Sequence, residues 1–442
     1  MARLFGTDGV RGVANRDLTP ELVFRLGRAA VRALGAGERP SLVVGRDTRA
    51  SGEMLEAALA AGICSAGGDV LHLGVIPTPG VAFLVTDLGA TAGAVISASH
   101  NPPEYNGIKF FSAEGMKLPD AVEGEIERLV DDEAGPRPQD PGRIVQEDED
   151  GAERYLEHLV AAAEGTLGGM TVVVDCANGA AHGLAPALLE RLGAEVYAIG
   201  DAPDGSNINV GFGATSPEAM AEAVRRFGAD AGVAHDGDAD RAILADAEGN
   251  LVDGDQILAA CAIDMHEEGA LAKDTVVTTT MANLGFRRAM EDAGIAILET
   301  DVGDRYVLEE MLRSGAVLGG EQSGHVIFLD RATTGDGLLT AARFLGLSRR
   351  KGVSVAELAA CMQRFPQVLV AVEVGDRDAV ARAEAVWQAV AAAEAALGSR
   401  GRVLVRPSGT EPVVRVMVEA ETEGEARGHA EAIAEAVRTA LA

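Results

Sequence analysis

Residues 95–109 read VISASHNPPEYNGIK, a stretch that combines a buried strand with a candidate catalytic loop. The apolar run that ends at Ile96 predicts a strand, and the Ser-Ala-Ser-His-Asn-Pro-Pro that follows ends this strand in a constrained loop. Ser99 is the candidate nucleophile, because His100 beside it can act as a base and Lys109 supplies a nearby cation. The alternative is a turn whose Ser and Asn side chains bond their own backbone, and other stretches must decide between the two.

Length, charge and cysteine content narrow the class of protein. A chain of 442 residues is too long for one hydrophobic core and predicts three or four domains. The formal net charge of −30 argues against nucleic acid and against an anionic membrane as partners. The four cysteines are far apart with no CxxC pair, which disfavours disulfides and a cysteine zinc site. The sequence shows no signal peptide and no uncharged apolar run of about 18 residues, so we expect a cytoplasmic protein.

Three segments repeat one order of strand, loop, helix and strand. Their first strands are expected at residues 41–45, 171–175 and 274–278, each a continuous β-branched or apolar run. Such runs alternating with amphipathic helices predict parallel sheets covered on both faces, and therefore three similar α/β domains.

The C-terminal part differs in kind. It predicts an antiparallel α+β domain whose strands and helices, in chain order, lie at residues 368–374, 376–397, 402–406, 413–420 and 423–441. Residues 131–150 are expected to form a polar linker, with a helix starting at Tyr155. The predicted domains are residues 1–150, 151–250, 251–365 and 366–442.

A second candidate site is the segment AHDGDADR, residues 234–241, which lies between two predicted strands. Asp236, Asp238 and Asp240 alternate with small residues in a tight turn, so their carboxylates can converge on a hard cation such as Mg²⁺. An EF-hand needs Gly at the sixth position and Glu at the twelfth, and the sequence has neither there. An exposed acidic turn is the alternative, but three converging carboxylates repel one another unless a cation offsets them.

Two further loops suit a phosphorylated sugar. RPSGTEP, residues 406–412, followed by Arg415, offers hydroxyls, free backbone N–H groups and two arginines for a phosphate. GGEQSGH, residues 319–325, offers Glu321 and Ser323 for vicinal hydroxyls, although the same letters also fit a plain hairpin. The loops FGTDGVRG at residues 5–12 and RDTRASG at residues 46–52 add cations.

Taken together, these ordered loops resemble the α-D-phosphohexomutase family, and within it the branch that acts on glucosamine phosphates. The opening FGTDGVRG and the TTGDG at residues 333–337 carry the resemblance to that branch. One loop departs from its pattern, since Phe-Gly-Ala-Thr at residues 212–215 stands where Cys-Gly-Ser-Thr is usual.

The resemblance implies four domains around a central cleft, three of them α/β and the last α+β. Ser99 would be phosphorylated and would be a ligand, with Asp236, Asp238 and Asp240, of one Mg²⁺ per chain. The resemblance also implies catalytic roles for Lys109, His100 and Arg11. It assigns substrate binding to Arg241, Glu321, Ser323, Arg406, Ser408, Gly409, Thr410 and Arg415.

The implied reaction interconverts glucosamine 6-phosphate and glucosamine 1-phosphate through a 1,6-bisphosphate, feeding UDP-N-acetylglucosamine and cell-wall synthesis. Two phosphates brought together unshielded would repel by on the order of 10 kcal/mol, which requires the cations of these loops. Three alternatives stay open: the same chemistry on glucose or mannose phosphates, a non-catalytic sugar-phosphate sensor, and a phosphatase with Asp236 as nucleophile and Asp238 as acid. A homodimer also stays open.

Overall fold

The computed structural model of the chain describes residues 4–6, 8–35, 39–132, 138–408 and 412–441. These residues form two compact units, one made of Met1–Thr280 with Ile295–Ala360 and the other of Met281–Gly294 with Cys361–Ala442. No helix within the described ranges has the length and apolar character needed to span a membrane.

The first sheet of the larger unit has six strands in the order β1-β5-β4-β2-β3-β6. Their bounds are β1 Val10–Val13, β2 Ser41–Arg46, β3 Asp69–Val75, β4 Ala92–Ile96, β5 Tyr105–Phe111 and β6 Ile144–Gln146. Strand β2 pairs in parallel with β3 and β4, while β5 pairs antiparallel with β4 and β1. The strand that precedes Ser99 is therefore fixed in the interior of the sheet.

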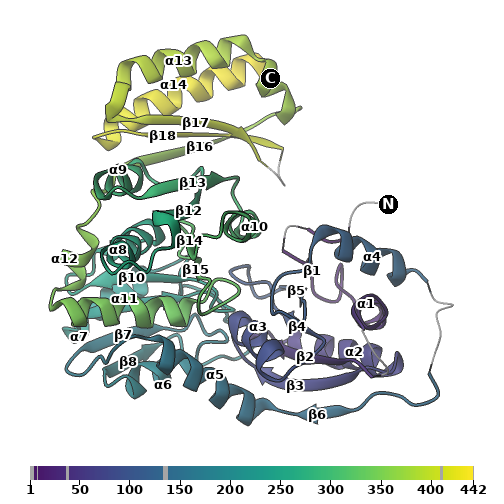
Figure 1. The fold of residues 1–442 in the computed structure, drawn as a ribbon. Coiled ribbons are helices and arrows are strands. Elements are labelled where there is room, and N and C mark those ends of the chain that lie inside the picture. The colour runs from purple at the N-terminus through teal and green to yellow at the C-terminus, as the bar shows by residue number, and fades with distance from the viewer. Residues whose placement is uncertain (1–3, 7, 36–38, 133–137, 409–411, 442) are drawn as a thin grey trace. The chain divides into compact units, whose positions relative to one another are not determined.

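Both faces of this sheet are buried, as its apolar runs predict. Leu42 and Val44 belong to one core cluster, whereas Val43 and Val95 belong to another on the opposite face. The covering helices are α1 Pro20–Leu34, α2 Gly52–Ser65, α3 Thr78–Asp87 and α4 Asp120–Val130 (Figure 1). The side chains of β4 are fully enclosed, so its C-terminal end is held rigidly.

Two more sheets complete the larger unit, in the orders β11-β10-β9-β7-β8 and β13-β12-β14-β15. The second sheet has β7 Thr171–Asp175, β8 Glu195–Ile199, β9 Ala231–His235, β10 Ala242–Asp246 and β11 Leu251–Val252. The third has β12 Thr275–Thr279, β13 Ala296–Thr300, β14 Leu318–Gly320 and β15 Val326–Phe328. The helices in and between them are α5 Asp148–Ala162, α6 Leu184–Arg191, α7 Glu218–Phe227, α8 Gly254–Glu267, α10 Asp304–Ser314, α11 Gly337–Lys351 and α12 Val355–Ala359.

The smaller unit contains a three-stranded antiparallel sheet in the order β16-β18-β17. Its elements are α9 Leu284–Ala293, β16 Gln367–Glu373, α13 Glu384–Leu397, β17 Arg402–Pro407, β18 Val413–Glu419 and α14 Glu423–Leu441. Helices α13 and α14 cover one face of the sheet (Figure 1). The α+β build expected for the C-terminal part is confirmed.

The predicted fold class of three α/β domains and a C-terminal α+β domain is confirmed, with three local corrections. Each α/β sheet adds antiparallel strands to its parallel pairs, so the sheets are mixed. The predicted linker contains the edge strand β6, and the next helix starts at Asp148, where three acidic residues suit the positive end of the helix dipole. Helix α13 starts at Glu384 because Ala383 has a non-helical backbone and Arg377–Arg382 form a 3₁₀ helix.

Candidate active site

Ser99 lies three residues past the end of β4, in a loop fixed by buried polar groups. Its backbone φ of 50° is in the left-handed region, which is uncommon for a residue with a side chain. The Ser97 hydroxyl accepts a hydrogen bond from the Ser99 N–H at 2.9 Å and donates one to Asp47 Oδ2 at 2.7 Å. Ser97 and Asp47 thus stabilise the backbone conformation of Ser99 from the N-terminal side of the loop.

Arg49 holds the same loop from its other side. Its side chain is fully buried, and Nε donates to Asp47 Oδ2 at 2.9 Å. The terminal nitrogens donate to four carbonyls, those of Ser99 at 2.9 Å, Asn101 at 2.8 Å, Pro102, and Tyr105 at the start of β5 at 3.0 Å. One guanidinium therefore joins the loop to β5, and Asn209 Nδ2 donates to two of the same carbonyls, those of Ser99 and Asn101.

The Ser99 hydroxyl faces the acidic loop predicted to bind a metal. Its Oγ donates to Asp236 Oδ2 at 2.6 Å, across 137 residues of sequence, and lies 3.3 Å from His100 Nδ1. Burial, with Arg241 and Arg11 nearby, lowers the pKa of His100 to about 4. His100 is therefore neutral near pH 7 and able to accept a proton.

The turn between β9 and β10 brings Asp236, Asp238 and Asp240 together. One carboxylate oxygen from each lies within 4.8 Å of the others, and all three side chains are buried. The turn depends on Ala239, whose φ is 56°. The exposed acidic turn considered from the sequence is therefore wrong.

The electrostatics of this cluster fit a divalent cation. Oδ1 of Asp238 and Oδ1 of Asp240 are buried and make no hydrogen bond within the described part of the chain. Burial, together with the charges of Asp240 and Asp238, raises the pKa of the Asp236 carboxyl well above its usual range. Unpaired acceptors and mutually repelling carboxylates are the donor set that a hard cation stabilises.

Asp238 has partners of its own on the side of the first sheet. Its Oδ2 accepts from the Thr78 hydroxyl at 2.6 Å and from Lys109 Nζ at 3.0 Å. Burial opposes ionisation of Asp238, but Lys109 and the Thr78 hydrogen bond outweigh it and lower the pKa of this carboxyl. Asp238 and Asp8 in turn raise the pKa of Lys109 against the effect of burial, so Lys109 stays charged and cannot serve as a base near neutral pH.

Asp8 links Lys109 to the third sheet through Lys117. Its Oδ2 lies 3.0 Å from Lys109 Nζ and its Oδ1 lies 2.7 Å from Lys117 Nζ, and Arg11 contacts it as well. Lys117 also pairs with Asp304, at the start of α10. A chain of alternating charges thus connects Arg11 on β1 with the first residue of α10.

Glu321 and Ser323 lie in the hairpin loop between β14 and β15, as predicted. Glu321 Oε1 accepts from the Gly303 N–H at 3.1 Å, whereas Ser323 Oγ is buried with no hydrogen-bond partner among the described residues. Arg241 lies next to this region, and its N–H donates to Asp236 Oδ1 at 3.3 Å.

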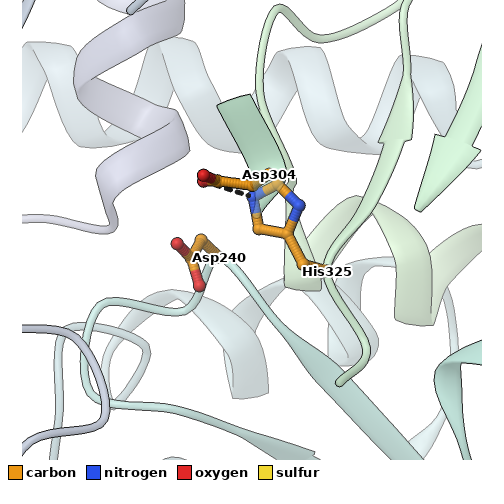
Figure 2. Close-up of side chains that lie close together, drawn as sticks. All are labelled: Asp240, Asp304 and His325. Atoms are coloured by element: carbon orange, nitrogen blue, oxygen red, sulfur yellow. Dashed lines mark ion pairs between the residues drawn. The ribbon is translucent and has the colours of Figure 1, made fainter. Parts of the chain in front are cut away.

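Two functional candidates were missed by the sequence reasoning, His325 and Asp304. Figure 2 shows them with Asp240, and one donor atom from each of the three lies within 4.8 Å of the others. His325 Nε2 is 3.4 Å from Asp304 Oδ2. The signals available in the sequence were the His that ends GGEQSGH and the Asp that follows a glycine at residue 303.

The TTGDG segment packs against this histidine. A Cβ at Gly335 would lie 2.3 Å from His325 Nε2 and 2.5 Å from both Cδ2 and Cε1. Only glycine leaves room for the ring there. Asp336, the next residue, caps α11 by accepting from the Leu339 N–H at 2.9 Å and also accepts from the Tyr155 hydroxyl at 2.8 Å.

The predicted phosphate loop belongs to the smaller unit. Arg406 on β17 and Arg415 on β18 are directly opposite in the antiparallel register, and Ser408 follows β17. Gly409 and Thr410 lie outside the described residues. The prediction that this loop shares a cleft with Ser99 stays a prediction.

Comparison with known proteins identifies the class. Four domain profiles match in order: phosphoglucomutase/phosphomannomutase α/β/α domains I, II and III at residues 2–136, 153–249 and 253–365, and the C-terminal domain at residues 369–436. The chain belongs to the phosphoglucomutase/phosphomannomutase family, which confirms the family predicted from its loops.

Two curated relatives carry the name of one enzyme within this family. A protein of Moorella thermoacetica named phosphoglucosamine mutase is 58% identical over 424 residues, covering 95% of each chain. The phosphoglucosamine mutase of Thermobifida fusca is 57% identical over 425 residues, covering 95% of this chain and 94% of its own. These names agree with the predicted branch and do not favour a glucose- or mannose-phosphate enzyme.

Solved structures share the fold over the whole chain. A phosphoglucomutase/phosphomannomutase family protein from Burkholderia thailandensis has a TM-score of 0.83 at 27% identity, covering 99% of this chain and 97% of its own. Aspergillus fumigatus N-acetylphosphoglucosamine mutase, in complex with GlcNAc-6P and magnesium, has a TM-score of 0.72 at 20% identity, covering 99% and 96%. At that identity the likeness concerns the fold.

Proposed function

We propose that this enzyme interconverts glucosamine 6-phosphate and glucosamine 1-phosphate by way of a phosphorylated Ser99. The observation that carries the proposal is the contact between the Ser99 hydroxyl and Asp236, which joins the nucleophile loop to the acidic loop. The relatives named phosphoglucosamine mutase, at 57–58% identity over nearly the whole chain, support the hexosamine substrate.

The first transfer breaks the bond between phosphorus and Ser99 Oγ and forms a bond from phosphorus to the C1 oxygen of glucosamine 6-phosphate. The C1 hydroxyl proton leaves to a base, and Ser99 Oγ takes up a proton as it departs. The candidates for the base are His100, which its low pKa keeps neutral, and His325, whose ring nitrogens make no hydrogen bond among the described residues. Lys109, held charged, stabilises the transferring phosphoryl group.

The second transfer reverses the chemistry at the other end of the sugar. The 1,6-bisphosphate turns over, Ser99 Oγ gives up its proton and attacks the phosphorus at C6, and the C6 oxygen takes a proton as it leaves. Glucosamine 1-phosphate and phosphorylated Ser99 result. Arg11 and Arg241 spread positive charge near the reacting groups, which offsets repulsion between two phosphates.

Mg²⁺ is the metal we assign to Asp236, Asp238 and Asp240, with phosphorylated Ser99 as a further ligand. The support is the all-oxygen donor set and the buried oxygens of Asp238 and Asp240 that make no hydrogen bond with any described residue. When bound, the ion supplies positive charge that offsets the charge of the phosphoryl oxygens.

The remaining assignments concern the residues that bind substrate, the domain bounds, the cellular location and the oligomeric state. Glu321 and Ser323 bind sugar hydroxyls, and the loop with Arg406, Ser408, Gly409, Thr410 and Arg415 binds the phosphate that is not reacting. The proposal keeps four domains at residues 1–150, 151–250, 251–365 and 366–442, a cytoplasmic location, and a homodimer as the alternative to a monomer.

The proposal is tested by turnover of purified protein with glucosamine, glucose and mannose 6-phosphates. We expect clear preference for glucosamine 6-phosphate, and a loss of about 10⁴-fold or more in Ser99→Ala. The control is Ser112→Ala in the same domain, whose hydroxyl bonds to Glu114 at 2.7 Å. Equal turnover of the three sugars would refute the branch assignment. Full activity of Ser99→Ala would refute the mechanism and favour a phosphatase.

A further inference from the structure

We infer that Asp240, Asp304 and His325 form a second divalent-cation site, with a nitrogen–oxygen donor set suited to Zn²⁺ rather than Mg²⁺. The three side chains come from separate elements: the turn after β9, the first residue of α10, and the end of the loop before β15. The site is distinct from the all-carboxylate set of Asp236, Asp238 and Asp240, and it shares only Asp240 with that set.

The geometry of His325 and Asp304 is that of two ligands to one metal. Their facing atoms, Nε2 and Oδ2, are 3.4 Å apart, and neither ring nitrogen of His325 makes a hydrogen bond within the described part of the chain. Bonds of about 2.0–2.2 Å from a tetrahedral Zn²⁺ to nitrogen and oxygen place these atoms roughly 3.3–3.5 Å apart. The observed separation matches that value.

The surroundings fix the ring so that Nε2 stays available. The side chain of His325 is 3% exposed. A Cβ built on Gly335 would be almost equally close to three ring atoms, at 2.3, 2.5 and 2.5 Å, so Gly335 lies over the face of the imidazole and not in its plane. The edge of the ring that carries Nε2 is therefore left open on the side of Asp304 (Figure 2).

Asp304 retains capacity for a metal despite its other partners. Oδ1 accepts from the Arg305 N–H at 2.7 Å and Oδ2 from Lys117. A carboxylate has about four lone-pair sites, so each oxygen keeps one. Asp240 Oδ1 is buried without a hydrogen-bond partner among the described residues, although Arg241 Nε lies 3.8 Å from it. One carboxylate oxygen of Asp240 lies within 4.8 Å of the donor atoms of Asp304 and His325.

The donor types decide which cation binds. Mg²⁺ prefers oxygen ligands in octahedral geometry, whereas imidazole with carboxylates suits Zn²⁺ or Co²⁺. A metal at this site would take one carboxylate oxygen of Asp240, leave the other for Mg²⁺, and withdraw His325 from the reacting groups. The second site is therefore inhibitory: Zn²⁺ lowers turnover even when Mg²⁺ is saturating.

The test measures metal binding directly, without turnover, so its outcome is separate from that of the proposed function. The full-length protein is titrated with Co²⁺ in a large excess of Mg²⁺, and the visible ligand-field spectrum is followed. We expect one equivalent of Co²⁺ with the absorption of a low-coordinate nitrogen–oxygen site, displaced by Zn²⁺. His325→Gln should weaken binding by about 100-fold and Asp304→Asn by about 10–100-fold.

Three further variants make the test specific. Gly335→Ala keeps the imidazole but displaces it, and should also weaken Co²⁺ binding. His182→Gln, a histidine whose Nδ1 lies 3.0 Å from the Gly179 carbonyl, should leave it unchanged. Asp238→Asn should impair Mg²⁺ binding and spare Co²⁺. Circular dichroism checks the fold of each variant. Co²⁺ affinity that is unchanged by His325→Gln, or abolished by Asp238→Asn, would overturn the second site.

Discussion

Replacing Arg49 by methionine should loosen the loop that carries Ser99. The substitution removes the donor shared by four carbonyl groups and leaves Asp47 as a buried charge without its ion-pair partner. Breaking a buried pair by removing one member costs about 3–5 kcal/mol. Since each 1.4 kcal/mol corresponds to a factor of ten, the loop should open roughly 150 to 4,000 times more often.

Hydrogen exchange on the native protein measures the opening of this loop by itself. A local measurement is needed because a chain of several domains does not unfold in one step. Amide protection in peptides spanning residues 93–109 should fall by that factor in Arg49→Met. Turnover should fall with it, because displacement of a reacting group by about 1 Å costs on the order of 10²-fold. Arg49→Lys should keep the positive charge without the full set of hydrogen bonds, so amide protection and turnover should lie between those of the wild type and of Arg49→Met.

A second Arg–Asp pair of the same domain provides the matched control. Arg39 and Asp69 have nearly the same contact distance, 2.8 Å against 2.9 Å, but their side chains are 39% and 24% exposed. Arg39→Met should change protection by less than about 1 kcal/mol. Equal losses of protection in the two variants, or none in Arg49→Met, would refute the reasoning that burial gives this guanidinium its importance.

Three further outcomes follow from other contacts of the larger unit. Thr78→Val removes the 2.6 Å hydrogen bond to Asp238 and should raise the Mg²⁺ concentration for half-maximal activity about 10–100-fold, measured by metal titration, whereas Thr78→Ser should restore it. Burial raises the pKa of Asp175 to about 6, so the folded protein holds the carboxyl proton more tightly than the unfolded chain does. The free energy of unfolding should therefore decline by up to about 3 kcal/mol as pH rises from about 4 to about 6. In Asp175→Asn, the denaturant midpoint should lack this decline. Lys117→Met should lower kcat about 10–100-fold by freeing Asp304, with partial rescue in Lys117→Arg, and an unchanged kcat would show that the link is dispensable.

Local sequence patterns were sufficient to predict the strand before Ser99 and the acidic turn. The apolar run ends where Ser, Asn and Pro follow it, and the carboxylates at alternate positions of a short turn lie close enough in sequence to converge. The repeated strand–helix order likewise predicted three α/β domains, since each unit is encoded within a contiguous segment.

Contacts between distant segments could not be predicted in the same way. Arg49 and the Ser99 loop are about 50 residues apart, and nothing in RDTRASG indicates that its second arginine binds carbonyl groups. Asp304 and His325 come from separate loops that only the third sheet brings together. Strand β6 was missed because its exposed, short sequence carries no apolar pattern of a buried strand.

The mass of the peptide that carries Ser99 tests the central claim most directly. In protein as isolated, this peptide should carry one phosphoryl group, which should pass to glucosamine 6-phosphate when that sugar is supplied in excess and return when the 1,6-bisphosphate is added. A Ser99 peptide that stays unmodified in an enzyme turning over glucosamine phosphates at full rate would contradict the account.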